Sequence, residues 1–266
     1  MTAPQRLTYA IAPRVEAFST LRHGGYSQGN HGAFNANLYC GDDGRAVLQN
    51  RALLCQAMGI GGERLVMPHQ THGCECRHID ENFFKLSQPL RLATLEGVDA
   101  LLTSMKNVCI GVSTADCIPI ILYDTVHHSA AVVHAGWRGT VQRIVQNAVG
   151  RMNECFGTAP QHLKAVIGPG ISLDSFEVGD EVYDAFDRCG LDMQRIARKY
   201  PTNDGFSQKW HIDLWECNRL QLAESGVPSA QIHTAGICTM QNSTDFFSAR
   251  KLGISSGRIL TGVILR

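Results

Sequence analysis

Neither sign of charge is in excess in this sequence, which has 24 basic and 24 acidic side chains among 266 residues. Proteins that bind nucleic acids carry a marked basic excess, so this balance argues against a nucleic-acid partner. No window reaches the run of about 18 apolar residues that a membrane-spanning helix needs. The first six residues also lack the apolar core of a secretory signal. We therefore expect a cytoplasmic protein that binds no nucleic acid and no membrane.

Local signatures of metal sites are missing as well. The ten cysteines form no Cys-x-x-Cys pair, and the eleven histidines form neither His-x-His nor His-Glu-x-x-His. Nothing local in the sequence therefore forces a metal site. Ten thiols in a long chain without a secretory start do not indicate a disulfide scaffold either, so we expect reduced cysteines.

Low-complexity tracts, linkers and internal repeats are absent from the sequence. Hydrophobic residues make up 44% of the chain and charged residues 18%, which is typical of a globular protein with a well-buried core. A chain of this length can form one large domain when sheets dominate. We expect a single domain over residues 1–266.

Short apolar runs and amphipathic stretches follow one another without a regular strand–helix repeat. Apolar residues at helical spacing predict helices over residues 45–58, 141–152, 179–188 and 213–224. Runs rich in β-branched residues predict strands over 108–112, 118–123, 130–134 and 259–265, with a hairpin turn over 124–129. The first 43 residues, dense in Gly and Asn, are expected to form loops and edge structure. This mixture predicts an α+β fold with mixed sheets flanked by helices.

Three short motifs place metal-ligand or nucleophilic side chains at the ends of apolar runs. They are Gln-Thr-His-Gly at residues 70–73, Thr-Ala-Asp-Cys at 114–117 and His-Ala-Gly-Trp-Arg-Gly at 134–139. His72, Cys117 and His134 could be three ligands with an open fourth position, which is the arrangement of catalytic zinc. Alternatively, Cys117 and His134 could form a thiolate–imidazole nucleophile pair, or Cys117 could simply pack as a small apolar residue. The spacing alone leaves these alternatives open.

Arg138 directly precedes the helix that we expect to begin at residues 139–140. Unpaired N–H groups and the helix dipole at such an N-terminus favour an anion. Arg138 is therefore a candidate for holding a phosphate or carboxylate, with a surface helix-capping role as the alternative.

Other titratable side chains give weaker signals. His69 is three residues from His72, which on a strand would put the two on opposite faces. The histidines at 127–128 fall in the predicted turn and are expected to be solvated. Asp99 and Glu177 are carboxylates in apolar surroundings, and either could be a hydrogen-bond partner of a ligand histidine or a structural acceptor.

Together the three motifs resemble those of the YfiH-like laccase-domain family, whose members are also described as polyphenol oxidases and as purine nucleoside phosphorylases. The match continues in order along nearly the whole chain, for example at Arg-His-Gly-Gly (22–25), Gly-Asp-Asp (41–43) and Phe-Phe-Ser-Ala-Arg (246–250). The resemblance implies an α+β architecture related to cysteine-hydrolase-like toxin deamidases. It also implies a single zinc ion held by His72, Cys117 and His134.

The same resemblance implies an activity. It is phosphorolysis of adenosine, inosine, guanosine or methylthioadenosine, with deamination of adenosine as a second reaction. The substrates would be a purine nucleoside and phosphate. Cys117, His134 and Arg138 are then the catalytic candidates, and Arg138, Arg250 and His23 are the candidates for binding phosphate or substrate.

Three alternatives remain. One branch of the family is tied to editing of a peptidoglycan precursor, where a zinc or Cys hydrolase cuts an amide-type bond. The family's older name points to a copper-dependent polyphenol oxidase, which the lack of His-x-His and of a motif around any Met disfavours relative to zinc. The third is a non-catalytic binding protein with structural zinc, which would need a fourth ligand that the motifs do not offer.

Overall fold

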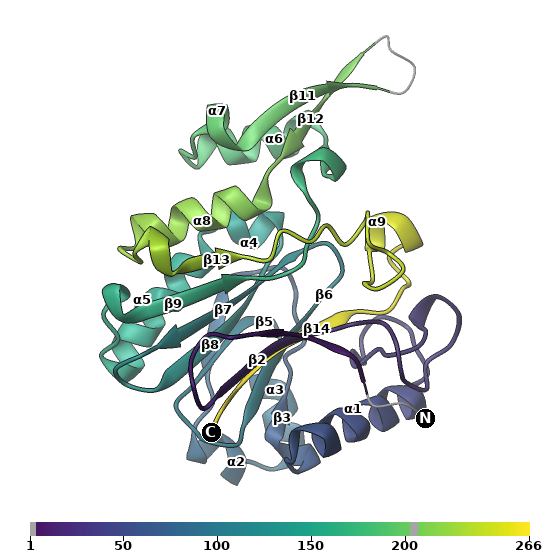
Figure 1. Ribbon diagram of the computed structural model, residues 1–266, viewed down its shortest axis with the longest axis vertical. Helices are drawn as coiled ribbons and strands as arrows, with labels where there is room; N and C mark the ends of the chain where they lie inside the picture. Colours follow the sequence, from purple (N-terminus) through teal and green to yellow (C-terminus); the bar gives the residue numbers. More distant parts are fainter. Residues whose placement is uncertain (1–3, 203–206) are drawn as a thin grey trace.

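The computed structural model describes residues 4–202 and 207–266, and its strands form three sheets (Figure 1). The six-stranded sheet has the order β13 (Ile232–Thr234), β9 (Leu163–Ile167), β7 (Ile118–Asp124), β8 (Ser129–Ala135), β5 (Val98–Thr103), β4 (Glu75–His78). The five-stranded sheet has the order β1 (Arg6–Tyr9), β2 (Val15–Thr20), β14 (Ile259–Leu265), β6 (Cys109–Thr114), β3 (Leu65–Val66). A third sheet of β10 (Glu177–Val178), β12 (Gln208–Ile212) and β11 (Ala197–Pro201) includes the hairpin that projects at the top of Figure 1. Both large sheets mix parallel and antiparallel pairs, which confirms the predicted mixed α+β fold.

Helices cover the outer faces of the two large sheets. The α-helices are α1 (Gly44–Met58), α2 (Glu81–Lys85), α3 (Gln88–Thr94), α4 (Trp137–Val141), α5 (Ile144–Phe156), α6 (Asp180–Arg188), α7 (Met193–Ile196), α8 (Leu214–Glu224) and α9 (Ala249–Leu252). Short 3₁₀ turns are η1 (Gly29–His31), η2 (Gly62–Arg64), η3 (Pro160–His162), η4 (Leu173–Ser175) and η5 (Ser229–Gln231). α5 packs on β8, β5 and β4, and α8 packs on β9 and β13. α1 lies on the other side of the molecule, against the five-stranded sheet (Figure 1).

The β7–β8 hairpin lies at the centre of these layers. Every residue of both strands is buried. Ile118, Ile120 and Leu122 pack toward α5, whereas Ile121 and Tyr123 pack toward the five-stranded sheet. An apolar run without alternation is what a strand covered on both faces requires, so this hairpin is a rigid scaffold for whatever lies at its two ends.

Most of the predicted elements are confirmed. The helices predicted over 45–58, 179–188 and 213–224 are α1, α6 and α8, and the four predicted strands are β6, β7, β8 and β14. The side chain of Asp213 accepts a hydrogen bond from the Glu216 amide, as expected of a helix N-cap. In the described part of the chain, no helix combines the length and apolar character that a membrane crossing needs.

Three predictions were wrong in detail. The helix expected over 141–152 is broken, because Arg143 adopts a left-handed φ of 59° between α4 and α5. The chain is already helical at Trp137, so Arg138 lies inside α4 and not before a helix. The first 43 residues include β2, which lies inside the five-stranded sheet between β1 and β14. Its polar Ser19 concealed it, since that hydroxyl is buried against those of Tyr9 and Thr261.

Candidate functional site

The three motifs meet at one end of the central strands β7 and β8 of the six-stranded sheet. Cys117 immediately precedes β7, His134 lies near the end of β8, and His72 lies in the loop between β3 and β4. One ligand atom from each of the three residues lies within 4.8 Å of the others. The rings of His72 and His134 have centroids 4.9 Å apart and are nearly perpendicular. The three side chains that the sequence singled out therefore surround a common point and could hold a metal ion.

One buried carboxylate, Asp99 on β5, orients this cluster. Its Oδ1 lies 2.6 Å from Nδ1 of His134, which donates, and also accepts from the His72 amide at 3.1 Å. Its Oδ2 accepts from the amide of Gly73 at 2.8 Å. Asp99 thus fixes the ring of one histidine and the backbone of the other, and it leaves the other ring nitrogen of His134 for Cys117. Of the two carboxylates that the sequence offered, Asp99 is therefore the one that hydrogen-bonds a candidate ligand histidine. The Glu177 side chain is instead exposed.

Gly136 provides the close approach that the cluster needs. A Cβ at this position would lie 3.1 Å from Sγ of Cys117 and 3.1 Å from Cδ2 of His72. A side chain here would force these two candidate ligands to shift, which gives the Gly of the His-Ala-Gly-Trp motif a physical reason.

The electrostatics favour a charged thiolate–imidazolium pair when no metal is bound. Burial by itself would raise the pKa of Cys117, but the charge of His134 and hydrogen bonds from His134 and His72 lower it to about 6. Burial would lower the pKa of His134, but the Cys117 charge and the Asp99 hydrogen bond raise it to about 9. Burial opposes ionisation of Asp99 too, yet its contacts with His134 and the Gly73 and Thr71 amides keep its pKa below the usual value. A readily formed thiolate is the form of cysteine that binds metals or attacks carbonyl carbon.

A cavity of about 580 Å³ opens over the cluster. His134 is buried, Cys117 half-buried and His72 exposed, so the cluster is open toward this cavity. The cavity has the size of a small-molecule site. Its lining residues are Asn37, Tyr39, Cys40, His69, Gln70, His72, Ser113, Thr114, Ala115, Asp116, Cys117, His134, Ala249, Arg250, Ile254 and Arg258.

An aromatic pair forms part of the cavity wall. The rings of Tyr39 and His69 stack with centroids 3.9 Å apart. Nδ1 of His69 lies 2.8 Å from the Glu96 carboxylate. Residues 70–73 do not form a strand, and His72 has a left-handed φ of 64°, so the strand argument for His69 and His72 does not apply. His69 binds a partner of its own and lies beside the cluster.

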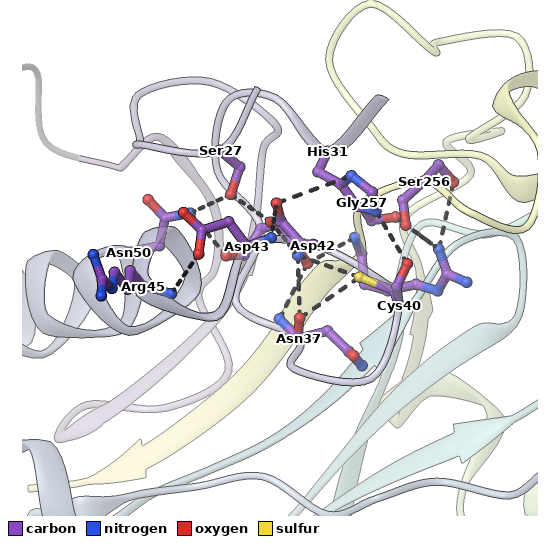
Figure 2. A network of polar contacts seen from close by, with 12 residues as sticks. Ser27, His31, Asn37, Cys40, Asp42, Asp43, Arg45, Asn50, Ser256 and Gly257 are labelled. Atoms are coloured by element: carbon purple, nitrogen blue, oxygen red, sulfur yellow. Dashed lines mark hydrogen bonds and ion pairs between the residues drawn. The ribbon is translucent and has the colours of Figure 1, made fainter. Parts of the chain in front are cut away.

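Polar contacts hold the loop that carries Tyr39. The side-chain amide of Asn37 donates to the Ser113 hydroxyl. The Gln70 side chain donates to the backbone carbonyl of Ser113 and accepts from its backbone N–H. Behind the loop, Asp42 accepts from the Ser27 hydroxyl at 2.6 Å, in the network drawn in Figure 2. Gln70 and Asp42 stood in the sequence only as members of motifs, and these contacts could not be predicted because they join distant segments.

The candidate phosphate residues do not all reach the cavity. Arg250 lines it, and both of its terminal nitrogens donate to the carbonyl of Glu177 at 3.1 Å. Arg138 is exposed and lies over the Trp137 ring at 4.3 Å, and His23 pairs with Asp245 at 2.8 Å. Arg138 and His23 are outside the described residues that line the cavity.

The chain is similar to known proteins over nearly its full length. The model of a family described as multi-copper polyphenol oxidoreductase laccase matches residues 16–266. A purine nucleoside phosphorylase of Bacteroides thetaiotaomicron is 47% identical over 252 residues, which are 94% of this chain and 92% of that protein. A protein named adenosine deaminase RL5, from an unknown prokaryotic organism, is 45% identical over 94% of this chain and 93% of its own.

Solved structures match the fold as well. YlmD from Geobacillus stearothermophilus has a TM-score of 0.89 at 30% identity, covering 100% of this chain and 98% of that one. The Bacillus licheniformis hypothetical protein YfiH has a TM-score of 0.89 at 27% identity, covering 99% and 97%.

Proposed function

The chain belongs to the multi-copper polyphenol oxidoreductase laccase family, and from this premise we propose that it acts on purine nucleosides. The proposed reaction is phosphorolysis of adenosine, inosine, guanosine or methylthioadenosine, with deamination of adenosine as a second activity. The observation that carries the proposal is the 47% identity, over 94% of this chain, to a protein named purine nucleoside phosphorylase. The 45% identity to a protein named adenosine deaminase supports the second activity.

We further propose that His72, Cys117 and His134 bind one zinc ion. A thiolate and two imidazoles suit zinc, and three protein ligands leave one position open. The fit is supported by the 4.8 Å limit on the separation of the ligand atoms and by Asp99, which holds the ring of one proposed ligand. When bound, a zinc ion there would supply Lewis acidity at the floor of the cavity. Bound to metal, Cys117 is unavailable as a nucleophile.

The chain's own residues would bind and orient the nucleoside. The exposed ring of Tyr39 offers an aromatic face on which a purine can stack. Arg250 supplies positive charge at the cavity, which favours an approaching phosphate, and its ties to Glu177 hold it in place. Roles for Arg138 and His23 in phosphate binding stay predictions.

A second candidate is a cysteine hydrolase that cuts an amide-type bond of a cell-wall precursor. It is favoured by one observation, the Cys117–His134–Asp99 series with a lowered thiol pKa. In that case the active form would be free of metal. For either function we propose the cysteine-hydrolase-like architecture that the family resemblance implies. Copper-dependent phenol oxidation is the chemistry that the family's description names.

We propose one domain over residues 1–266 and a cytoplasmic protein. All ten cysteines, every one in the described part of the chain, are free, which agrees with reduced thiols.

One assay separates these functions. Purified protein with zinc, with copper or without metal is given inosine and adenosine, each with and without phosphate, and in parallel a phenol. Free base, inosine and oxidised phenol are measured. The proposal expects the zinc-loaded protein to release free base only when phosphate is present. It also expects this form to convert adenosine to inosine. Activity confined to the metal-free protein, or phenol oxidation without nucleoside turnover, would contradict it. Cys155, a half-buried thiol at the end of α5, provides the matched control variant Cys155→Ala for Cys117→Ala.

A further inference from the structure

A second group of metal-ligating side chains lies at the other end of the β7–β8 hairpin. Asp124 is the last residue of β7, His127 lies in the turn, and His162 ends η3. One ligand atom from each of these residues lies within 4.8 Å of the others. Asp124 lies seven residue steps of extended chain beyond Cys117, so the two groups are roughly 20 Å apart.

The turn fixes the Asp124 carboxylate in place. Its side chain is fully buried, and Oδ1 accepts from the amides of Val126 at 2.8 Å and His127 at 3.2 Å. The other oxygen, Oδ2, lies 2.8 Å from Nδ1 of the exposed His127. One carboxylate oxygen therefore shapes the turn, and the other faces the imidazole.

His162 is held against this turn by its backbone. Its carbonyl accepts from both the amide and the hydroxyl of Thr125, at 3.1 Å and 3.0 Å. Its ring nitrogen Nδ1 is buried and has no hydrogen-bond partner among the described residues. A buried nitrogen without a partner is costly, and a bound cation is one way in which such a nitrogen is satisfied.

We propose that Asp124, His127 and His162 form a second metal site, for a first-row divalent cation such as zinc or cobalt. Two imidazoles and one carboxylate are ligands that these cations accept. Two ligand atoms at 2.0–2.2 Å from one cation can be at most about 4.4 Å apart, so small side-chain rotations close the site. The exposed side of His127 gives the cation access. The bound cation would clamp the β7–β8 turn to η3, away from the cavity, and this proposal does not depend on the proposed function.

Cobalt(II) titration distinguishes the two groups, because a thiolate ligand adds an intense near-ultraviolet charge-transfer band that oxygen and nitrogen ligands do not. Protein stripped with a chelator is titrated with cobalt(II) and followed by absorption and by equilibrium dialysis. The proposal expects two equivalents in the unaltered protein and one in His162→Ala, with the thiolate band retained. Cys117→Ala should bind one equivalent without the band. The control His233→Ala, at another exposed histidine, should bind two.

The same variants give a second readout. In protein that carries Cys117→Ala, excess zinc should raise Tm. Adding His127→Ala should raise the zinc concentration needed for half of this effect more than about tenfold, because a ligand is lost. His127 is exposed, so this substitution tests the site even where the loss of His162 disturbs folding. One cobalt equivalent with the thiolate band in the unaltered protein, two equivalents in His162→Ala, or an unchanged half-saturating zinc concentration after His127→Ala would overturn the proposal. Failure of the Cys117 site alone would instead show as loss of the thiolate band with cobalt still bound.

Discussion

The β7–β8 hairpin carries a group of candidate metal ligands at each end, and the two groups differ in their non-histidine member and in what surrounds them. Each group has one buried, one half-buried and one exposed side chain. At one end, Asp99 hydrogen-bonds His134, and a cavity of about 580 Å³ is lined by Cys117 and His134. At the other end, the Asp124 carboxylate is buried, but His127 is exposed in a turn. The same scaffold thus carries a cysteine-containing group beside a cavity at one end and a carboxylate-containing group in a turn at the other.

Removing the sulfur is the strongest way to break this comparison. Cys117→Ala should lower nucleoside turnover more than about 100-fold and remove the metal with the thiolate band, because a ligand is lost. The fold should persist, since the substitution only shortens a half-buried side chain. Steady-state kinetics and elemental analysis test this, with Cys155→Ala as the control that retains both. Full activity in Cys117→Ala would remove the residue from the site.

The supporting carboxylate comes next. Asp99→Asn should weaken metal affinity at the Cys117 end about 10–100-fold, because His134 loses its charged partner. The matched control is Glu96→Gln. The exposed Glu96 carboxylate lies 2.8 Å from Nδ1 of His69, and its loss should change the metal affinity by less than about threefold. Competition with a chromogenic chelator measures both affinities. Equal effects of the two substitutions on metal affinity would mean that the buried Asp99–His134 pair matters no more than the exposed Glu96–His69 pair.

The thiol titration sharpens the contrast within the metal-free protein. A thiolate forms as pH rises through the pKa, so alkylation of Cys117 by iodoacetamide should increase through about pH 6 and level off above it. Cys76 should stay unreactive at neutral pH, because burial raises its pKa to about 12. In Asp99→Asn the imidazolium of His134 is less favoured, so the midpoint for Cys117 should move upward. Peptide mapping by mass spectrometry follows each thiol, and a Cys117 midpoint near 9 would contradict the charged pair.

Two glycines give the smallest effects. Gly136→Ala should weaken metal binding several-fold, because the added methyl would lie 3.1 Å from Cys117 and His72. Gly150→Ala, on α5 where nothing lies within 4 Å of the added carbon, should stabilise the protein by about 0.5–1 kcal/mol. Metal competition and urea unfolding test the pair. Gly136→Ala with unchanged affinity would show that the close approach is not needed.

Local patterns predicted the parts of this fold that depend on local forces. The stripe of α5 and the largely apolar strands β7 and β8 follow from spacing and residue type. The break at Arg143 could not be predicted, because α4 and α5 continue one apolar pattern across it. The interior position of β2 was also hidden, since its polar hydroxyls are satisfied by distant strands.

The candidate site divides in the same way. His72, Cys117 and His134 stood out because each ends an apolar run in a distinctive motif. Asp99 was only one of two possible partner carboxylates, and its choice depends on the pairing of β5 with β8. The Tyr39 wall and the unpartnered nitrogen of His162 arise from contacts between distant segments, so no local pattern could have indicated them.

Zinc K-edge X-ray absorption on His162→Ala protein, loaded with one equivalent of zinc, tests the central assignment most directly. Binding by His72, Cys117 and His134 predicts one sulfur at about 2.3 Å and nitrogen or oxygen neighbours at about 2.0–2.1 Å. A first shell without sulfur would contradict it.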